Sequence, residues 1–249
     1  MTTPEQLFPV SAYLDLDEYN DHEEKHAYYL QMRSFIVDRI KQFQAESDRA
    51  IDVLENGAGT GLLTKHLLAI PGINLTLLEP DERSRPVLRA QLGEQNSHIN
   101  ILEGGAEELD GSTQWDLITS SFSHDHVKDS AKLAASLFSA LKVGGIYMAG
   151  VEILGDYSTD EGRIEALNKW HGFVIDDAKS KGEMELAKLE NEALVSGIGG
   201  IADFKKDIKN FEKDFEVVEG FVQVLKVKIG PLVPGNIGGV YVIAYQRTI

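Results

Sequence analysis

Three alternating glycines mark the part of the chain best suited to binding a ligand: Gly57, Gly59 and Gly61. They follow an apolar run at residues 51–55, typical of a strand, and precede a run typical of a helix. Glycine has no Cβ, so such a turn lets the backbone come within van der Waals reach of a ligand. The turn therefore indicates a nucleotide-like ligand. Because Leu62 stands where the dinucleotide fingerprint G-x-G-x-x-G has its last glycine, a pyrophosphate cradle is disfavoured.

Two carboxylates flank this turn along the chain. Glu55 lies two residues before Gly57, and Glu79 ends the apolar run at residues 74–79. The interval from Glu55 to Glu79 fits one intervening helix, so both acids are expected at the carboxyl ends of neighbouring strands. In open α/β sheets, ligands lie beyond that edge.

A histidine pair follows the strand predicted at residues 115–121 and is the candidate for acid–base chemistry. His124 and His126 flank Asp125 at the same edge of the sheet. An imidazole with a pKa near 6.5 can accept a hydroxyl proton at neutral pH. His124 is preferred because it comes sooner after the strand end, with His126 as the alternate. Metal binding is disfavoured because alternate residues on a loop point apart, and a surface or helix-capping role remains open.

Strands and helices alternate through the first part of the chain. Strands are predicted at residues 51–55, 74–79, 99–103, 115–121 and 146–154, and helices at 62–70, 83–92 and 129–141. This order implies right-handed βαβ units and a doubly wound, mostly parallel α/β sheet. A helix is predicted before it at 21–43. After it, helices are predicted from Ser158 in a capping box with Glu161, at 183–194 and around 204–211, followed by β-rich stretches at 215–229 and 239–246.

The motif series resembles that of the class I S-adenosylmethionine-dependent methyltransferases. The first motif, an acid followed by G-x-G-x-G, is matched by Glu55 and the turn that contains Ala58. The resemblance continues in the stretches at 103–109, 115–121 and 141–145. It implies a seven-stranded Rossmann-like sheet, S-adenosylmethionine as cofactor, S-adenosylhomocysteine as product, and no metal.

The resemblance also implies roles for single residues. Glu79, with Pro80 beside it, is expected at the ribose hydroxyls. Ser121 and Phe122 are expected at the floor of the methyl-transfer site. Many relatives carry Asp before the Ala of the third motif, where it contacts the adenine amino group, whereas this chain has Gly105. Adenine recognition is then expected from the Ala106 backbone and from Glu107.

The chain is expected to form one domain over residues 1–249. Its parts are an N-terminal helical cap at 1–45, a cofactor-binding core at 50–154, a helical lid and acceptor-pocket insertion at 155–212 and C-terminal strands at 213–249. In the resembling family, additions before the first strand and after the fifth cover the acceptor. The acceptor candidates are Tyr19, Glu152, Trp170 and His171. For Trp170 core packing is the alternative, and for Glu152 an exposed or ion-paired acid.

The composition of the chain disfavours several classes of partner and site. The 249 residues are 43% hydrophobic and 26% charged, with a formal net charge of −16, which repels nucleic acids and anionic membrane surfaces at long range. The absence of cysteine excludes a disulfide, a thiolate metal site and a thiol nucleophile. Because no secretory signal and no long apolar segment is evident, a cytoplasmic protein is expected.

The sequence therefore predicts a methyltransferase acting on a small molecule, at oxygen or nitrogen rather than carbon, as a monomer or homodimer. A nicotinamide dehydrogenase is disfavoured by Leu62. The alternative is a protein that binds S-adenosylmethionine without methylating, either as a regulatory module or as an enzyme that uses the sulfonium in another reaction such as a cyclisation. Turnover of a methyl acceptor would separate these hypotheses.

Overall fold

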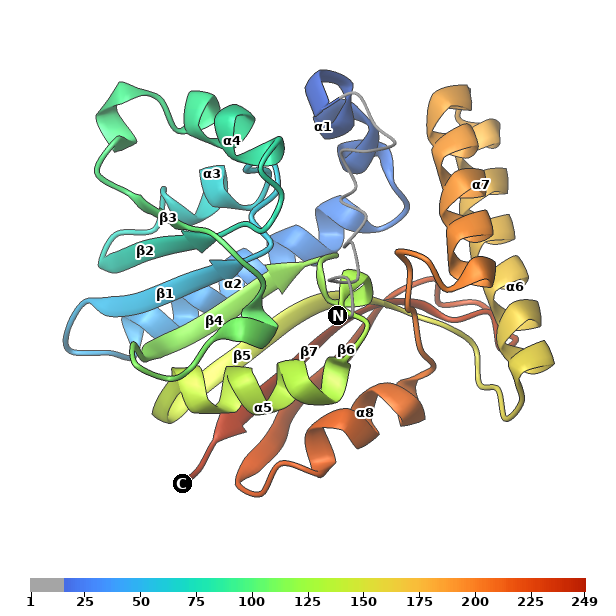
Figure 1. Cartoon of the computed structure of the whole chain (residues 1–249). Coiled ribbons are helices and arrows are strands. Elements are labelled where there is room, and N and C mark those ends of the chain that lie inside the picture. Colours follow the sequence, from blue (N-terminus) through green and yellow to red (C-terminus); the bar gives the residue numbers. More distant parts are fainter. Residues whose placement is uncertain (1–15) are drawn as a thin grey trace, which may run out of the picture.

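A single seven-stranded sheet organises the chain. The computed structural model describes residues 16–249, apart from the side chains of residues 17–19 and 21 (Figure 1). The strands are β1 Ile51–Asn56, β2 Ile73–Leu78, β3 Asn100–Leu102, β4 Trp115–Ser121, β5 Leu141–Ile153, β6 Phe221–Gly230 and β7 Gly239–Arg247. Their order is β3-β2-β1-β4-β5-β7-β6, and only β7 runs antiparallel to its neighbours. The predicted doubly wound, mostly parallel sheet is confirmed.

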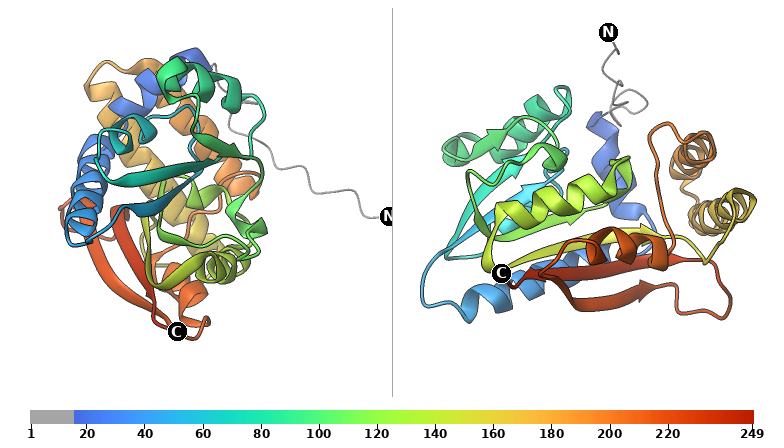
Figure 2. Two further views of the ribbon diagram at one scale, coloured as in Figure 1. Left: turned by 90° about the vertical axis from the view of Figure 1, so that its left-hand side faces the viewer. Right: turned by 60° about the horizontal axis from the view of Figure 1, so that its bottom comes forward.

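Helices cover both faces of the sheet. They are α1 Leu16–Lys25, α2 Tyr29–Ala45, α3 Thr64–Leu67, α4 Ser84–Leu92, α5 Ser130–Ala140, α6 Asp160–Ser180, α7 Met184–Gly199 and α8 Ile208–Glu216. Figure 2 shows α2 on one face and α5 on the other, and the buried apolar clusters divide in the same way. Helices α1, α6 and α7 lie beyond the carboxyl ends of the parallel strands (Figure 1).

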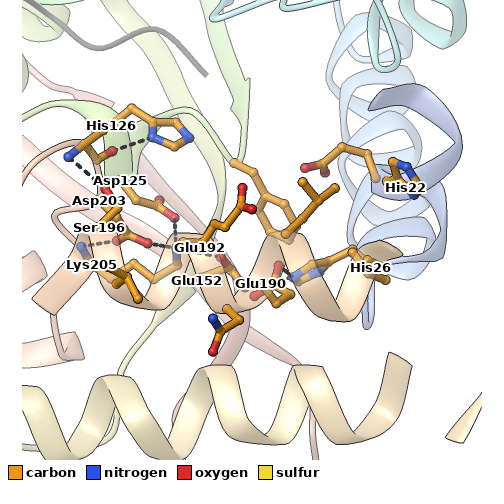
Figure 3. Close-up of a pocket in the computed structure, with 18 of the residues that line it drawn as sticks. His22, His26, Asp125, His126, Glu152, Glu190, Glu192, Ser196, Asp203 and Lys205 are labelled. Carbon is orange, nitrogen blue, oxygen red and sulfur yellow. Dashed lines mark hydrogen bonds and ion pairs between the residues drawn. The ribbon is translucent and has the colours of Figure 1, made fainter. Parts of the chain in front are cut away.

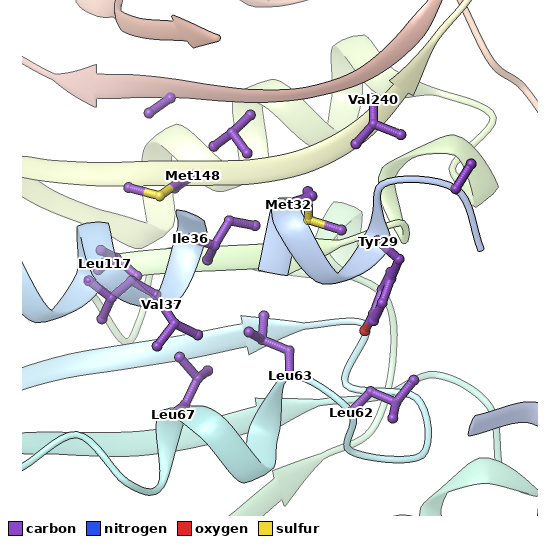
Figure 4. Packing of buried hydrophobic residues seen from close by; sticks show 14 of the residues in the cluster. Tyr29, Met32, Ile36, Val37, Leu62, Leu63, Leu67, Leu117, Met148 and Val240 are labelled. Atoms are coloured by element: carbon purple, nitrogen blue, oxygen red, sulfur yellow. The ribbon is translucent and has the colours of Figure 1, made fainter. Parts of the chain in front are cut away.

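The packing of α2 on the sheet fixes the position of the N-terminal part of the site. Met32, Ile36 and Ile40 recur at helical spacing and are fully buried. Figure 4 shows Met32 and Ile36 between α2 and the strands. A Cβ on Gly150 of β5 would stand 2.1 Å from the sulfur of Met32. The glycine therefore allows α2 to approach β5 closely.

Three predicted elements differ in the structure. The helix predicted at 21–43 is divided between α1 and α2, because Tyr28 adopts a left-handed conformation with φ 65° and redirects the chain. The helix predicted at 62–70 is reduced to α3. The capping box predicted at Ser158 is wrong by one residue, since Thr159 Oγ1 accepts the hydrogen bond from the Gly162 amide at 3.0 Å.

Within the described residues, no helix has the length and apolar character needed to cross a membrane. Residues 1–15 lie outside the described part, as does the side chain of Tyr19, a predicted acceptor contact within α1.

Candidate active site at the carboxyl edge of the sheet

The glycine turn joins β1 to α3 and has one packed and one open position. Gly57, Gly59 and Gly61 all have positive φ, at 68°, 55° and 98°. A Cβ on Gly57 would lie 2.4 Å from the Cβ of Ser123, whereas a Cβ on Gly59 would meet nothing within 4 Å. The turn is held from behind, because the Gly57 and Ala58 amides donate to the Leu78 carbonyl at 2.9 and 3.1 Å. Gly59 thus borders space that a ligand can fill.

Two buried carboxylates support this turn. Glu79 accepts hydrogen bonds from the Gly59 amide at 2.6 Å and the Asp81 amide at 2.8 Å. Glu55 accepts one from Thr64 Oγ1 at 2.7 Å. Burial raises the pKa of both carboxyl groups, that of Glu55 to about 8 with a further contribution from the charge of Glu79. A cationic ligand beside them would favour their ionised forms.

The segment after β3 places an unsatisfied carboxylate near the same edge. Ala106 is buried in a short 3-10 helix, Ala106–Glu108. A Cβ on Gly105 would stand 2.3 Å from Oε2 of Glu107, so the Glu107 carboxylate fills the space that a side chain at position 105 would take. Oε2 is buried and has no hydrogen-bond partner. A buried acceptor without a donor costs free energy, which a ligand donor would recover.

The loop after β4 connects the glycine turn to a cavity. Ser121 is the half-buried last residue of β4, and Ser123 Oγ donates to the Asn56 carbonyl at 3.0 Å. Between them, Phe122 has a left-handed φ of 52°, unusual for a bulky residue, and lines the cavity. Its amide donates to the Gly150 carbonyl at 2.9 Å. The backbone strain at Phe122 is therefore held in place by β5.

The cavity has a volume of about 400 Å³ and lies between α1, the loop after β4, α7 and residues 201–205 (Figure 3). It adjoins the glycine turn, because Asn20 of α1 accepts a hydrogen bond from Thr60, and His22 and His26 farther along line the cavity. Its volume is in the range of small-molecule sites.

An ion network forms the floor of the cavity. Glu152, at the end of β5, accepts a hydrogen bond from Trp170 Nε1 at 2.9 Å. It also pairs with His26 Nε2 at 3.3 Å and with Lys205 Nζ at 3.1 Å. Burial alone would lower the pKa of His26, but the carboxylates of Glu152 and Glu190 outweigh it and raise the value to about 10.

A second set of contacts extends the network behind the cavity wall. His171 is fully buried, with Nδ1 2.9 Å from Glu190 and Nε2 3.6 Å from Asp203. Asp203 also pairs with Lys205 at 2.5 Å. Burial disfavours the charged imidazole, but these acids raise the pKa of His171. His26, directly after α1, Glu190 of α7 and Lys205 thus meet at the end of β5.

Known proteins resemble this chain in sequence. A family described as "Methyltransferase domain" matches residues 28–182. Malonyl-[acyl-carrier protein] O-methyltransferase 1 of Ilyobacter polytropus is 25% identical over 118 residues, 47% of this chain and 44% of that protein. Ubiquinone biosynthesis O-methyltransferase of Rickettsia bellii is 26% identical over 114 residues, 45% of this chain and 46% of that protein. This chain thus spans less than half the length of these curated relatives.

Solved structures share the fold. Geranyl diphosphate C-methyltransferase of Streptomyces coelicolor, solved with Mg²⁺, geranyl diphosphate and S-adenosylhomocysteine, superposes with a TM-score of 0.60 at 12% identity, covering 98% of this chain and 88% of that one. The chain belongs to the class I S-adenosylmethionine-dependent methyltransferases. It is accordingly an enzyme.

The two predicted histidines of this methyltransferase lie in different surroundings. His124 is buried, with its ring 4.7 Å from that of Phe211 and its Nδ1 3.2 Å from the Tyr147 hydroxyl, outside the cavity. Burial lowers its pKa to about 4. His126 lines the cavity, and its Nδ1 lies 2.8 Å from the Ala202 carbonyl. Of the two histidines, His126 lines the cavity and His124, the one preferred from the sequence, does not.

Only some of the residues predicted to contact the acceptor line the cavity. Glu152 lines the cavity, whereas Trp170 and His171 do not and instead contact Glu152 and Glu190. Pro80 is exposed beside Glu79. Sequence reasoning missed Lys205 as well as Glu190, because a single Lys or Glu among many charged positions carries no distinguishing spacing.

Proposed function

We propose that this methyltransferase transfers a methyl group from S-adenosylmethionine to oxygen or nitrogen of a small-molecule acceptor held in the cavity. The observation that carries the proposal is the cavity of about 400 Å³, which shares α1 and the loop after β4 with the glycine turn. When bound, the sulfonium supplies an electrophilic methyl group, so alignment is the enzyme's main contribution, with effective molarities of about 10⁵–10⁸ M available.

The residues around the turn fit this cofactor. The open face at Gly59 admits its approach, and Glu79 is the proposed acceptor of the ribose hydroxyls. The unpartnered Oε2 of Glu107 is the proposed acceptor for the adenine amino group, with the Ala106 backbone beside it. Ser121 and Phe122 form the proposed floor between cofactor and acceptor.

His126 is the proposed acid–base residue. A carbonyl can only accept a hydrogen bond, so contact with Ala202 assigns the proton of a neutral His126 ring to Nδ1. Nε2 is then the basic nitrogen, able to take a proton from the acceptor. His124, buried among aromatic rings, is the proposed alternate only if the loop rearranges.

Helix α1 with His26 after it and the α6–α7 insertion form the proposed cover of the site. Lys25 of α1 pairs with Glu183 at 2.9 Å, and His26 pairs with Glu190 at 3.2 Å, so the two parts of the cover meet above the edge of the sheet. Hydrogen exchange in these segments should slow when S-adenosylhomocysteine is added. Equal protection with and without ligand would count against a cover.

The function is tested by titration and by turnover. Calorimetry of the full chain should detect S-adenosylmethionine and S-adenosylhomocysteine but not NADH. Mass spectrometry of reactions with a metabolite mixture should then reveal S-adenosylhomocysteine together with one acceptor heavier by a methyl group. Cofactor binding with no turnover on any acceptor would favour the non-methylating alternative.

A further inference from the structure

We propose that the acceptor is an amine, bound as its ammonium at the floor of the cavity with an apolar body along α7, and that acids and phosphates are excluded. This inference rests on the proposed function, because it concerns the occupant of the acceptor cavity. It selects nitrogen over oxygen as the methylated atom.

The residues that line the cavity are mostly acidic where they are charged. Among the residues that the structure describes, six carboxylates line the cavity: Glu23, Asp125, Glu152, Glu190, Glu192 and Asp203. The same described lining includes one lysine, Lys205, and no arginine. Because the chain also carries a net charge of −16, an anionic acceptor would be repelled both at a distance and in the cavity.

The cations at the floor of the cavity already form ion pairs with carboxylates of the chain. The ammonium of Lys205 lies 2.5 Å from Asp203 and 3.1 Å from Glu152. His26 lies 3.3 Å from Glu152 and 3.2 Å from Glu190. An acceptor carboxylate or phosphate would have to break these buried pairs to gain a partner, which is costly. A bound ammonium would add a cation to a floor richer in carboxylates.

Asp125 is the carboxylate best placed to bind the ammonium of an acceptor. It is 5% exposed and lines the cavity, yet its ion pair with Lys205 measures 3.6 Å, beyond hydrogen-bond distance. Burial raises the pKa of its carboxyl to about 6. An ammonium that donates to Asp125 would satisfy a buried carboxylate that Lys205 reaches only weakly.

Apolar side chains also line the cavity, beside the α7 carboxylates Glu190 and Glu192. Leu186 and Leu189 of α7 line it, followed by Val195 and Ile201. Val195 and Ile201 remain 62% and 49% exposed, so apolar surface extends to the mouth of the cavity. This surface would be covered by the hydrocarbon part of an amphipathic amine.

Methyl transfer to an amine needs one proton acceptor, and His126 supplies it. The ammonium first gives one proton to His126 Nε2, and His126 then releases this proton to solvent. The freed nitrogen lone pair then forms the bond to the methyl carbon, while the carbon–sulfur bond breaks with its electron pair going to sulfur. One ammonium and one sulfonium thus become one methylammonium, one thioether and one released proton.

Binding of matched probes tests the proposal. The full chain, saturated with S-adenosylhomocysteine, is titrated with hexylamine, hexanoate and hexyl phosphate by calorimetry. The amine should bind at least about tenfold more tightly than either anion. Glu192→Lys, which reverses a charge in the lining, should reduce this preference by about tenfold. Glu185→Lys makes the same change on an exposed part of α7 outside the lining and should change it less than about twofold.

The outcomes separate this inference from the proposed function. Equal affinity for the probes, a preference for either anion, no measurable amine binding, or equal effects of the two α7 variants would overturn the amine assignment. Failure of S-adenosylhomocysteine to bind in the preceding titration would instead overturn the proposed function.

Discussion

Acids at the two ends of the same parallel strands have opposite pKa shifts. At the amino end, Asp116 pairs with Arg49 and lies 2.9 Å from Lys142, which also lies 2.6 Å from Asp52. Burial would raise the pKa of Asp116, but these cations lower it to about 2. At the carboxyl end, burial and the charge of Glu79 raise the pKa of Glu55 to about 8, although the hydrogen bond from Thr64 opposes the shift.

This difference separates acids that form ion pairs within the fold from acids that we propose to face bound ligands. The amino-end acids are already neutralised by cations of the chain, so they contribute to stability at neutral pH. The carboxyl-end acids Glu55, Glu79 and Asp125 all have raised pKa values. Cations brought by a cofactor and an acceptor would lower the free energy of their ionised forms. The comparison therefore predicts different consequences for mutations at the two edges.

The largest effect is expected at His126. His126→Ala should lower the single-turnover rate by about 10²–10⁴-fold while S-adenosylhomocysteine affinity stays nearly unchanged. His124→Ala should instead open a cavity among the rings of Phe211 and Tyr147 and lower the free energy of unfolding by about 1–3 kcal/mol. Rapid-quench assays and denaturant unfolding of both variants measure these effects. A rate loss confined to His124→Ala would reverse the assignment.

The next effect is expected in the glycine turn. Gly57→Ala combines a left-handed backbone with a clash against Ser123, so the free energy of unfolding should fall by about 2–4 kcal/mol. Gly144, near the amino edge, also has a positive φ but open space around it. Gly144→Ala should therefore cost only about 1 kcal/mol. Urea unfolding compares the two, and equal losses would show that the contact with Ser123 is not a constraint.

The pH dependence of stability should have opposite signs at the two edges. The raised pKa of Glu55 means that its contribution is most favourable below about 4.5 and is lost as the pH rises through about 8. Glu55→Gln should therefore raise stability above about pH 8, by about 2–4 kcal/mol, and leave it nearly unchanged near pH 4.

Asp116→Asn supplies the opposite case. The lowered pKa of Asp116 gives stability that is present above 3.8 and is lost as the pH falls through about 2. This variant should therefore be less stable than the wild type at neutral pH, and the difference should shrink in acid. Thermal unfolding between about pH 3 and 9 checks both variants. Parallel curves for the two would contradict the contrast between the edges.

The smallest effect is expected at Glu107. Glu107→Gln keeps the shape but removes the charge of the proposed adenine acceptor, so S-adenosylhomocysteine affinity should fall by about three- to tenfold. S-inosylhomocysteine lacks the amino donor and should lose little on this substitution. Calorimetry with both ligands measures the difference. An equal loss of affinity for both ligands would show that Glu107 does not bind the adenine amino group.

The local parts of the site were predictable, and the parts assembled over long distances were not. Glu55, the glycine turn and Glu79 follow from strand ends and spacing within one βαβ unit. The histidines differ because a 3-10 helix, His124–His126, turns alternate residues to different sides. The left-handed Tyr28 that separates α1 from α2 carries no propensity signal, and its ring stacks on Phe173, far away in the sequence.

The floor of the cavity illustrates the same limit. His26, Glu152, Glu190 and Lys205 come from four distant segments, and each is unremarkable in its own sequence neighbourhood. Their meeting depends on where α1 and α7 rest against the end of β5. Only the three-dimensional arrangement identifies them as one network.

Calorimetric titration of S-adenosylhomocysteine into the wild type, Glu79→Gln and Asp116→Asn tests directly whether the cofactor binds at the carboxyl edge. We expect binding to the wild type, affinity weakened by about 10–100-fold in Glu79→Gln, and affinity within about twofold of the wild type in Asp116→Asn despite its lower stability. Absence of binding to the wild type, or equal loss of affinity in the two variants, would contradict a cofactor site at the carboxyl edge of the sheet.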